Sequence, residues 1–158
     1  MTVEIIQPEF ELAAKLGPGK GIDPAVLQRA EQAIAAMAGE YVAWATRDVG
    51  RLQAAVASAR GNPADPAALT PVREIAHEVR GQGGTFGYPL VTRLASSLYR
   101  LLVERPVLPL AAYATLDAHV DALRAVIAQG VKGDGGAVGQ QLAGELEAMV
   151  ARLVAEPA

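Results

Sequence analysis

Apolar residues recur at spacings of three and four along most of the chain, which is the pattern of amphipathic helices. The first stripe begins after Asp23-Pro24, a favourable helix start, and runs toward Gly61-Asn62-Pro63. Its phase slips near Gly39 and Gly50, so it allows either one long helix with a bend or two helices in series; we expect one long helix. The stripe consists of Leu27, Ala30, Ile34, Met37, Tyr41, Trp44, Ala45, Val49, Leu52 and Val56.

Four further helices follow from the same pattern. The second begins between residues 65 and 71 and ends at the turn Gly87-Tyr88-Pro89, where Phe86 and Tyr88 are expected to close its end. The third covers residues 90–104, the fourth residues 109–130, and the last starts at residue 137. The residues predicted to face inward are Val72, Ile75, Ala76, Val79, Leu94, Ala95, Leu98, Leu101, Leu102, Leu116, Val120, Leu123, Val126, Ile127, Leu142, Leu146, Met149, Val150 and Leu153.

Strand-like alternation is absent from the sequence, so the predicted fold is all-α: an antiparallel four-helix bundle with an extra C-terminal helix and an N-terminal extension. Proline and glycine between residues 8 and 21 predict an N-terminal arm over residues 1–23. The bundle then covers residues 24–130, a flexible linker residues 131–136, and the C-terminal helix residues 137–158.

Composition narrows the classes of function. With 158 residues the chain can bury a core as one domain, and 51% hydrophobic but only 4% aromatic residues favour helix packing. A formal charge of -3 provides no basic field for nucleic acid, and the absence of cysteine excludes disulfides and thiolate sites. No signal peptide or membrane-spanning run is evident, so we expect a cytoplasmic protein without a membrane partner.

The second helix carries His77, which is followed by Gly81, Gly83, Gly84 and Gly87. Each glycine inside a helix costs about 1 kcal/mol relative to alanine. In a chain so rich in alanine, this cost indicates that something must approach the backbone closely beside the histidine.

A face centred on His77 can be read from helical spacing. Ile75 and Val79 lie one turn apart and face the core, so the histidine between them points away from it. Residues three, four and seven positions later share its face, and two further candidates lie one turn before it. The candidate site therefore consists of His77, Arg80, Gly81, Gly84, Arg73 and Glu74.

These residue types suit phosphoryl transfer. A free imidazole is mostly neutral at pH 7, is nucleophilic, and can form a covalent intermediate. A guanidinium cannot act as a base, but it can hold anionic oxygens. Phosphoryl transfer needs mainly positioning and charge neutralisation. A histidine and an arginine are therefore sufficient on this chain if a partner brings the metal ion.

The run from Ala76 to Tyr88, AHEVRGQGGTFGY, resembles the histidine phosphotransfer (HPt) domain. That family has the pattern His-x-hydrophobic-Lys-Gly and a further glycine ten residues after the histidine. The run is also similar to the Gly-x-Ala-Gly-Thr-Phe-Gly-Phe segment in the phospho-accepting domain of chemotaxis histidine kinases. The resemblance extends over about residues 41–130, and the matching positions are His77, Val79, Arg80, Gly81 and Gly87.

The resemblance implies that His77 is phosphorylated on its outer ring nitrogen. It also implies that Arg80 takes the place of the usual lysine and that Gly81 lets a receiver domain approach, while Gly84 and Gly87 match later glycines. Arginine keeps the charge but changes its reach, and Gly83 replaces a residue that is usually alanine or serine. The implied partners are response-regulator receiver domains or a sensor histidine kinase. The receiver would supply Mg²⁺, so the chain would need no cofactor and would be a phosphate carrier that is not itself a kinase.

Two other functions stay open. The chain could be a helical adaptor that binds signalling partners without carrying phosphate, or the substrate of a kinase acting in trans. Elsewhere, His119 is expected to pack or to be solvated, and we expect no metal site from the two histidines because no third ligand is placed by spacing. Ser96 and Ser97 have no base near them in the sequence, which argues against a hydrolase site.

Overall fold

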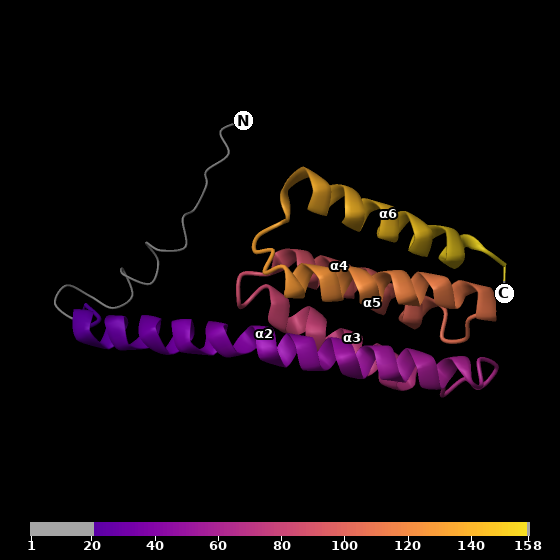
Figure 1. Cartoon of the computed structure of the whole chain (residues 1–158), viewed down its shortest axis with the longest axis horizontal. Helices are drawn as coiled ribbons and strands as arrows, with labels where there is room; N and C mark the ends of the chain where they lie inside the picture. Colours follow the sequence, from indigo (N-terminus) through magenta and orange to yellow (C-terminus); the bar gives the residue numbers. More distant parts are fainter. Residues whose placement is uncertain (1–20, 158) are drawn as a thin grey trace. The chain divides into compact units, whose positions relative to one another are not determined.

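The computed structural model describes residues 21–157, and every regular element in that range is helical (Figure 1). Close contacts divide the chain into two compact units, residues 1–37 and residues 38–158. Helix α2 (Pro24–Arg60) begins in the first unit and continues in the second, which confirms the prediction of one long helix. Asp23 caps its start, since the Asp23 carboxylate accepts a hydrogen bond of 2.9 Å from the backbone N–H of Ala25. The predicted arm lies outside the described residues as far as residue 20.

In the first unit, the apolar residues of the predicted stripe are not buried. Leu27, Ile34 and Met37 are 48%, 60% and 47% exposed, and the buried residues of α2 start at Tyr41. The prediction placed the bundle from residue 24 onward. The spacing of apolar residues marks one face of a helix, but it does not reveal along which part of the helix that face is buried.

The second unit contains four more α-helices and one short 3-10 helix. They are α3 (Thr70–Gly83), α4 (Pro89–Glu104), the 3-10 helix η1 (Leu110–Ala112), α5 (Tyr113–Ala128) and α6 (Gly136–Ala155). Prolines in the first turns of α3 and α4 explain why both begin close to their predicted positions. Each observed boundary lies within a few residues of the predicted one, so the predicted helices of this unit are confirmed.

One hydrophobic core joins the helices of the second unit. Helix α4 lies at its centre and packs against α3, α5 and α6, while α6 lies along α4 and α5 (Figure 1). Because α4 has neighbours on several sides, its leucines are almost completely buried. The fully or nearly fully buried leucines of α4 are Leu90, Leu94, Leu98, Leu101 and Leu102.

Aromatic rings close the end of the core next to the turn between α3 and α4. The ring of Tyr41 stacks on Phe86, with centroids 4.9 Å apart, and lies 5.1 Å from the ring of Tyr88. Tyr88 is buried and Phe86 is half-buried, which confirms their predicted role at the end of the helix. Burial, with Tyr88 and Asp48 nearby, raises the pKa of Tyr41 to about 12.

The segment between α5 and α6, which was predicted to be a flexible linker, forms backbone hydrogen bonds with residues of the turn after α3 and the start of α4. The backbone N–H of Gly133 donates to the carbonyl of Gly87 at 3.0 Å, and the N–H of Leu90 donates to the carbonyl of Gly133 at 3.3 Å. Gly135 has a φ of 76° and lies against Leu90. The glycines therefore serve tight backbone approach here, and they fasten the start of α6 to the turn that follows α3.

No helix between residues 21 and 157 combines the length and the apolar character needed to cross a membrane.

Candidate functional site

Helix α3 places His77 on the outer surface of the second unit. Its neighbours Ile75, Ala76 and Val79 are buried against the core, whereas the side chain of His77 is exposed. The prediction that His77 points away from the core is confirmed. The imidazole is therefore accessible to a macromolecular partner.

Arg80 lies one turn after the histidine and contacts its ring. Its Nη2 atom lies 3.1 Å from Nδ1 of His77. The guanidinium also stacks on Tyr99 of α4, with Cζ 4.4 Å from the ring centroid, and the Tyr99 and His77 rings are 5.4 Å apart between centroids. Sequence reasoning missed Tyr99, because its contribution depends on how α3 and α4 pack and no spacing within either helix reveals it.

A shallow hollow of about 290 Å³ lies beside the imidazole. Arg73 and Glu74, the candidates from the preceding turn, line it together with His77, Glu78 and Tyr99. The structure thus brings Arg73, Glu74, His77 and Arg80 together on one face, as helical spacing predicted.

A neighbouring ion pair extends this face to helix α2. Arg51 donates to the carboxylate of Glu78 at 3.2 Å and to that of Asp48 at 3.0 Å. These two hydrogen bonds, that to Asp48 first, raise the pKa of Arg51. Arg51 and Glu78 are each about half exposed, so their pair adds little to stability. In the site, the ion pair with Arg51 partly neutralises the negative charge of Glu78, the residue that follows His77 in the sequence.

The four glycines after His77 differ in what a side chain would meet at each position. A β-carbon on Gly83 would lie 2.6 Å from Oγ1 of Thr92, so the packing of α3 on α4 requires glycine there. Gly87 has a φ of 84°, which favours glycine. A β-carbon on Gly81 would meet open space, and one on Gly84 would lie 3.8 Å from Thr92. The fold therefore explains Gly83 and Gly87 but gives no internal reason for Gly81.

Three other glycines in helix interiors also face open space, so an open glycine is not in itself a sign of function. They are Gly39, Gly50 and Gly144. What distinguishes Gly81 is its place one turn after an exposed histidine and next to the arginine that contacts that histidine.

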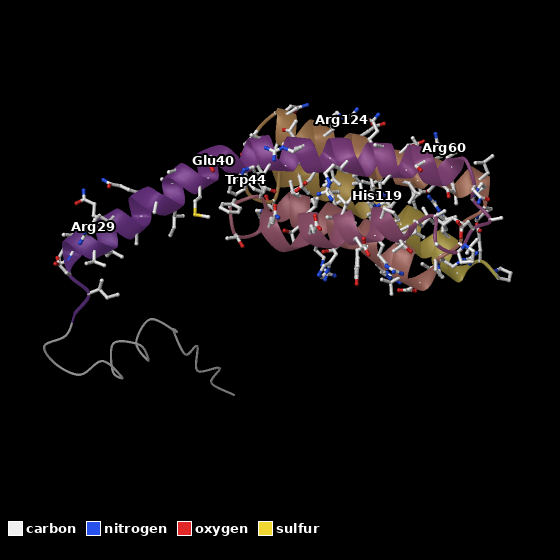
Figure 2. All side chains as sticks on the ribbon, turned by 90° about the horizontal axis from the view of Figure 1, so that it is seen from below. Arg29, Glu40, Trp44, Arg60, His119 and Arg124 are labelled. Carbon is white, nitrogen blue, oxygen red and sulfur yellow. The ribbon has the colours of Figure 1, made fainter. Side chains whose placement is uncertain are left out.

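The second histidine is part of the core. His119 is fully buried between the helices (Figure 2). Its Nδ1 lies 2.8 Å from the carbonyl oxygen of Thr115, and its Nε2 lies 3.0 Å from Oγ of Ser97. Burial lowers the pKa of His119, and the hydrogen bond to Thr115 partly opposes that shift. The structure thus places a base beside Ser97, which corrects the expectation that this serine has none.

The Ser97–His119 pair has the contact of a nucleophile and a base but lacks the rest of a hydrolase site. Ser97 is in the middle of α4, where backbone N–H groups bond within the helix and none is available to stabilise an oxyanion. The hollow of about 280 Å³ beside it is lined by the ion pair of Arg93 with Glu147, with contacts of 2.7 and 2.8 Å. We interpret Ser97 and His119 as a buried structural pair.

Comparisons with protein-family models, curated proteins and solved structures give no match to this chain. The resemblance to HPt domains therefore depends on the motif residues and on where the structure places them. Within residues 21–157, the acidic and histidine side chains form no group of three that could hold a metal ion.

Proposed function

We propose that this chain is a histidine phosphotransfer protein that accepts a phosphoryl group on His77 from the aspartyl phosphate of one receiver domain and passes it to another. We further propose that α2 from residue 38, α3, α4 and α5 correspond to the antiparallel four-helix bundle of that family. Helix α6 is then an additional helix packed on α4 and α5.

One observation carries this proposal: an exposed histidine next to a helical glycine that the fold itself does not need. A β-carbon on Gly81 would meet nothing within the chain, yet glycine there costs about 1 kcal/mol of helix stability. A partner whose surface lies against the turn after His77 accounts for both the glycine and the accessible imidazole. A receiver domain, which must bring an aspartyl phosphate to the ring, is such a partner.

The chemistry requires little from the chain. The lone pair of one ring nitrogen of His77 attacks phosphorus, and the bond from phosphorus to the aspartate oxygen breaks. The aspartate leaves as a carboxylate with the electron pair of that bond, and the reverse reaction delivers the phosphoryl group to a second aspartate. The receiver supplies Mg²⁺ to neutralise the phosphoryl oxygens, so the roles left to this chain are nucleophile and docking surface.

A direct test is to mix the full-length protein with a phosphorylated receiver and to follow the label. Label should appear on this chain as an acid-labile, base-stable phosphohistidine and should be absent from His77→Gln. Persistence of transfer in His77→Gln would overturn the assignment, since His119 is buried and cannot reach a receiver.

Two glycine variants separate docking from folding. Gly81→Gln and Gly144→Gln each place the same side chain at a helical glycine whose β-carbon meets open space. Both variants should fold, but only Gly81→Gln should slow transfer from the receiver. Equal rates for the two variants would show that the partner does not dock over Gly81.

The same experiment separates the other functions. An adaptor would bind the receiver with full affinity and yield no phosphohistidine. A substrate domain for a kinase in trans would take label from ATP only when a separate histidine kinase domain is added.

A further inference from the structure

The two histidines of this chain have partners of opposite hydrogen-bonding character at the same ring atom. For His119, Nδ1 faces the carbonyl oxygen of Thr115, which can only accept a hydrogen bond. In the neutral ring Nδ1 therefore carries the proton, and Nε2 accepts a hydrogen bond from the hydroxyl of Ser97.

At His77 the situation is reversed. Nδ1 lies 3.1 Å from Nη2 of Arg80, and a guanidinium can only donate. In the neutral imidazole Nδ1 must therefore be the acceptor, and the single ring proton must be on Nε2. Nε2 is the outer nitrogen, the one that HPt domains are expected to phosphorylate.

Two contacts with α4 support Arg80, one at its guanidinium and one at its backbone. It stacks on the ring of Tyr99, 4.4 Å from the centroid, an arrangement that attracts a cation to an aromatic face. The backbone of Arg80 is also fastened to α4, because the Thr92 hydroxyl donates to the Arg80 carbonyl at 3.1 Å. The hydrogen bond to His77 is therefore supported from the neighbouring helix.

A protonated ring nitrogen in a neutral imidazole has no lone pair available for attack. We propose that Arg80 is a latch: by donating to Nδ1 it keeps the proton of His77 on Nε2, and the chain is unreactive there until a docked partner draws the guanidinium away. The inference about the partner rests on the proposed function, whereas the inference about the proton concerns this chain alone.

Phosphoryl oxygens can open such a latch. They are charged acceptors, and a guanidinium bonds to them more strongly than to a neutral ring nitrogen. Once Arg80 turns to them, Nε2 loses its proton to water and Nδ1 takes one from water, with no net change in protonation. The Nε2 lone pair then attacks phosphorus, and the aspartate leaves as described above. Docking and activation of the nucleophile are thus the same event.

The proton position can be measured without any partner. Full-length protein labelled with ¹⁵N in histidine is examined by NMR at about pH 8.5, where an ordinary imidazole is neutral. We expect the proton of His77 on Nε2 and that of His119 on Nδ1, so the buried ring serves as an internal reference. A proton on Nδ1 of His77 in the wild-type chain would overturn the proposal.

Variants of Arg80 test the cause. Arg80→Met keeps an apolar side chain over Tyr99 but removes the donor, and it should shift the ratio of the two forms of His77 by about tenfold, the effect of one ordinary hydrogen bond. Arg80→Lys keeps a donor and should shift the ratio less. Arg100→Met makes the same change at an arginine that bonds to Glu104 and not to the ring, so it is the matched control and should leave the ratio unchanged. An unchanged ratio in Arg80→Met would refute the latch.

Reaction with a small neutral electrophile completes the test. Diethyl pyrocarbonate does not need the docking face and carries no phosphoryl oxygens, so it cannot draw the guanidinium away as a phosphoryl group would. Arg80→Met should be acylated on Nε2 of His77 several-fold faster than the wild type. A rate equal to or below that of the wild type would contradict the latch. Failure of every receiver to transfer phosphate, with the NMR result as expected, would refute the proposed function and leave the proton assignment intact.

Discussion

Gly83 lies against Thr92 so closely that a β-carbon on the glycine would be 2.6 Å from the threonine Oγ1 and 3.0 Å from its backbone nitrogen. The contact joins the end of α3 to the first turn of α4. Because it fixes the crossing of these two helices, it also sets where Tyr99 of α4 meets the ring of His77. A glycine that faces inward thus helps to build the outward face beside it.

Gly83→Ala should destabilise the protein by roughly 1–3 kcal/mol, the usual cost of forcing an extra carbon into a packed contact. The matched control is Gly81→Ala, two residues away and facing open space, which should be neutral or stabilising by up to about 1 kcal/mol. Urea unfolding followed by circular dichroism measures both. Equal stabilities for the two variants would contradict the close packing at Gly83.

Acid should weaken the core through His119. Burial lowers the pKa of this imidazole, so below about pH 6.5 the unfolded chain binds a proton that the folded chain resists. Its contribution to stability is complete above that pH and falls as the pH decreases. The pKa of the Glu147 carboxyl is lowered, mainly by its hydrogen bonds to Arg93. Its contribution to stability is therefore lost only below pH 4.5, a pH range that does not overlap with the loss due to His119.

The measurement compares unfolding free energies at about pH 7.5 and pH 5.0, which bracket the ordinary imidazole value. The wild-type chain should lose stability between them, and the double variant Ser97→Ala with His119→Leu should lose much less. Ser97→Ala alone leaves a buried ring nitrogen without its donor and should cost about 1–3 kcal/mol at the higher pH. An identical loss with acid in the wild type and the double variant would rule out His119 as the source.

In the turn before α6, hydrogen-bonded amides should be protected from exchange with solvent deuterium. The N–H groups of Gly133 and Leu90 are hydrogen-bonded, so both should exchange slowly. Gly135→Ala should speed that exchange and destabilise the fold more than Gly136→Ala. Both positions have positive φ, which costs alanine about 1–2 kcal/mol, but only at Gly135 would the β-carbon meet Leu90, at 2.7 Å.

Tyr41→Phe should not weaken the protein, although Tyr41 is almost fully buried. Its hydroxyl is buried and has no hydrogen-bond partner among the described residues. Removing it should change the free energy of unfolding by less than about 1 kcal/mol, toward greater stability. Tyr41→Ala, which removes the ring from Phe86 and Tyr88, should cost about 3–5 kcal/mol. A substantial loss in Tyr41→Phe would show that the hydroxyl is bonded, for example to a buried water.

The sequence predicted the helices well because their signals are local. Asp23, Pro71 and Pro89 mark helix starts through their own backbone preferences, and periodic leucines mark the buried side of α4. The outward direction of His77 also follows from helical spacing, because Ile75 and Val79 on the same helix face the core.

What could not be predicted depends on contacts between elements. Tyr99 reaches His77 from another helix, and Ser97 meets His119 across the core. The bonds from Gly133 to the turn after α3 join segments that are far apart in the sequence, so a glycine-rich run looked flexible when read alone. Each of these relationships depends on a helix crossing, which a single-helix pattern does not contain.

The glycines after His77 should be replaced in a definite order as related sequences diverge. Any descendant that keeps this helix crossing must keep Gly83, and Gly87 is favoured wherever the turn persists. Gly81 is under no such constraint from the fold. If a receiver docks over Gly81 as proposed, a descendant that no longer binds one should exchange Gly81 for a better helix former first, while Gly83 and Gly87 remain.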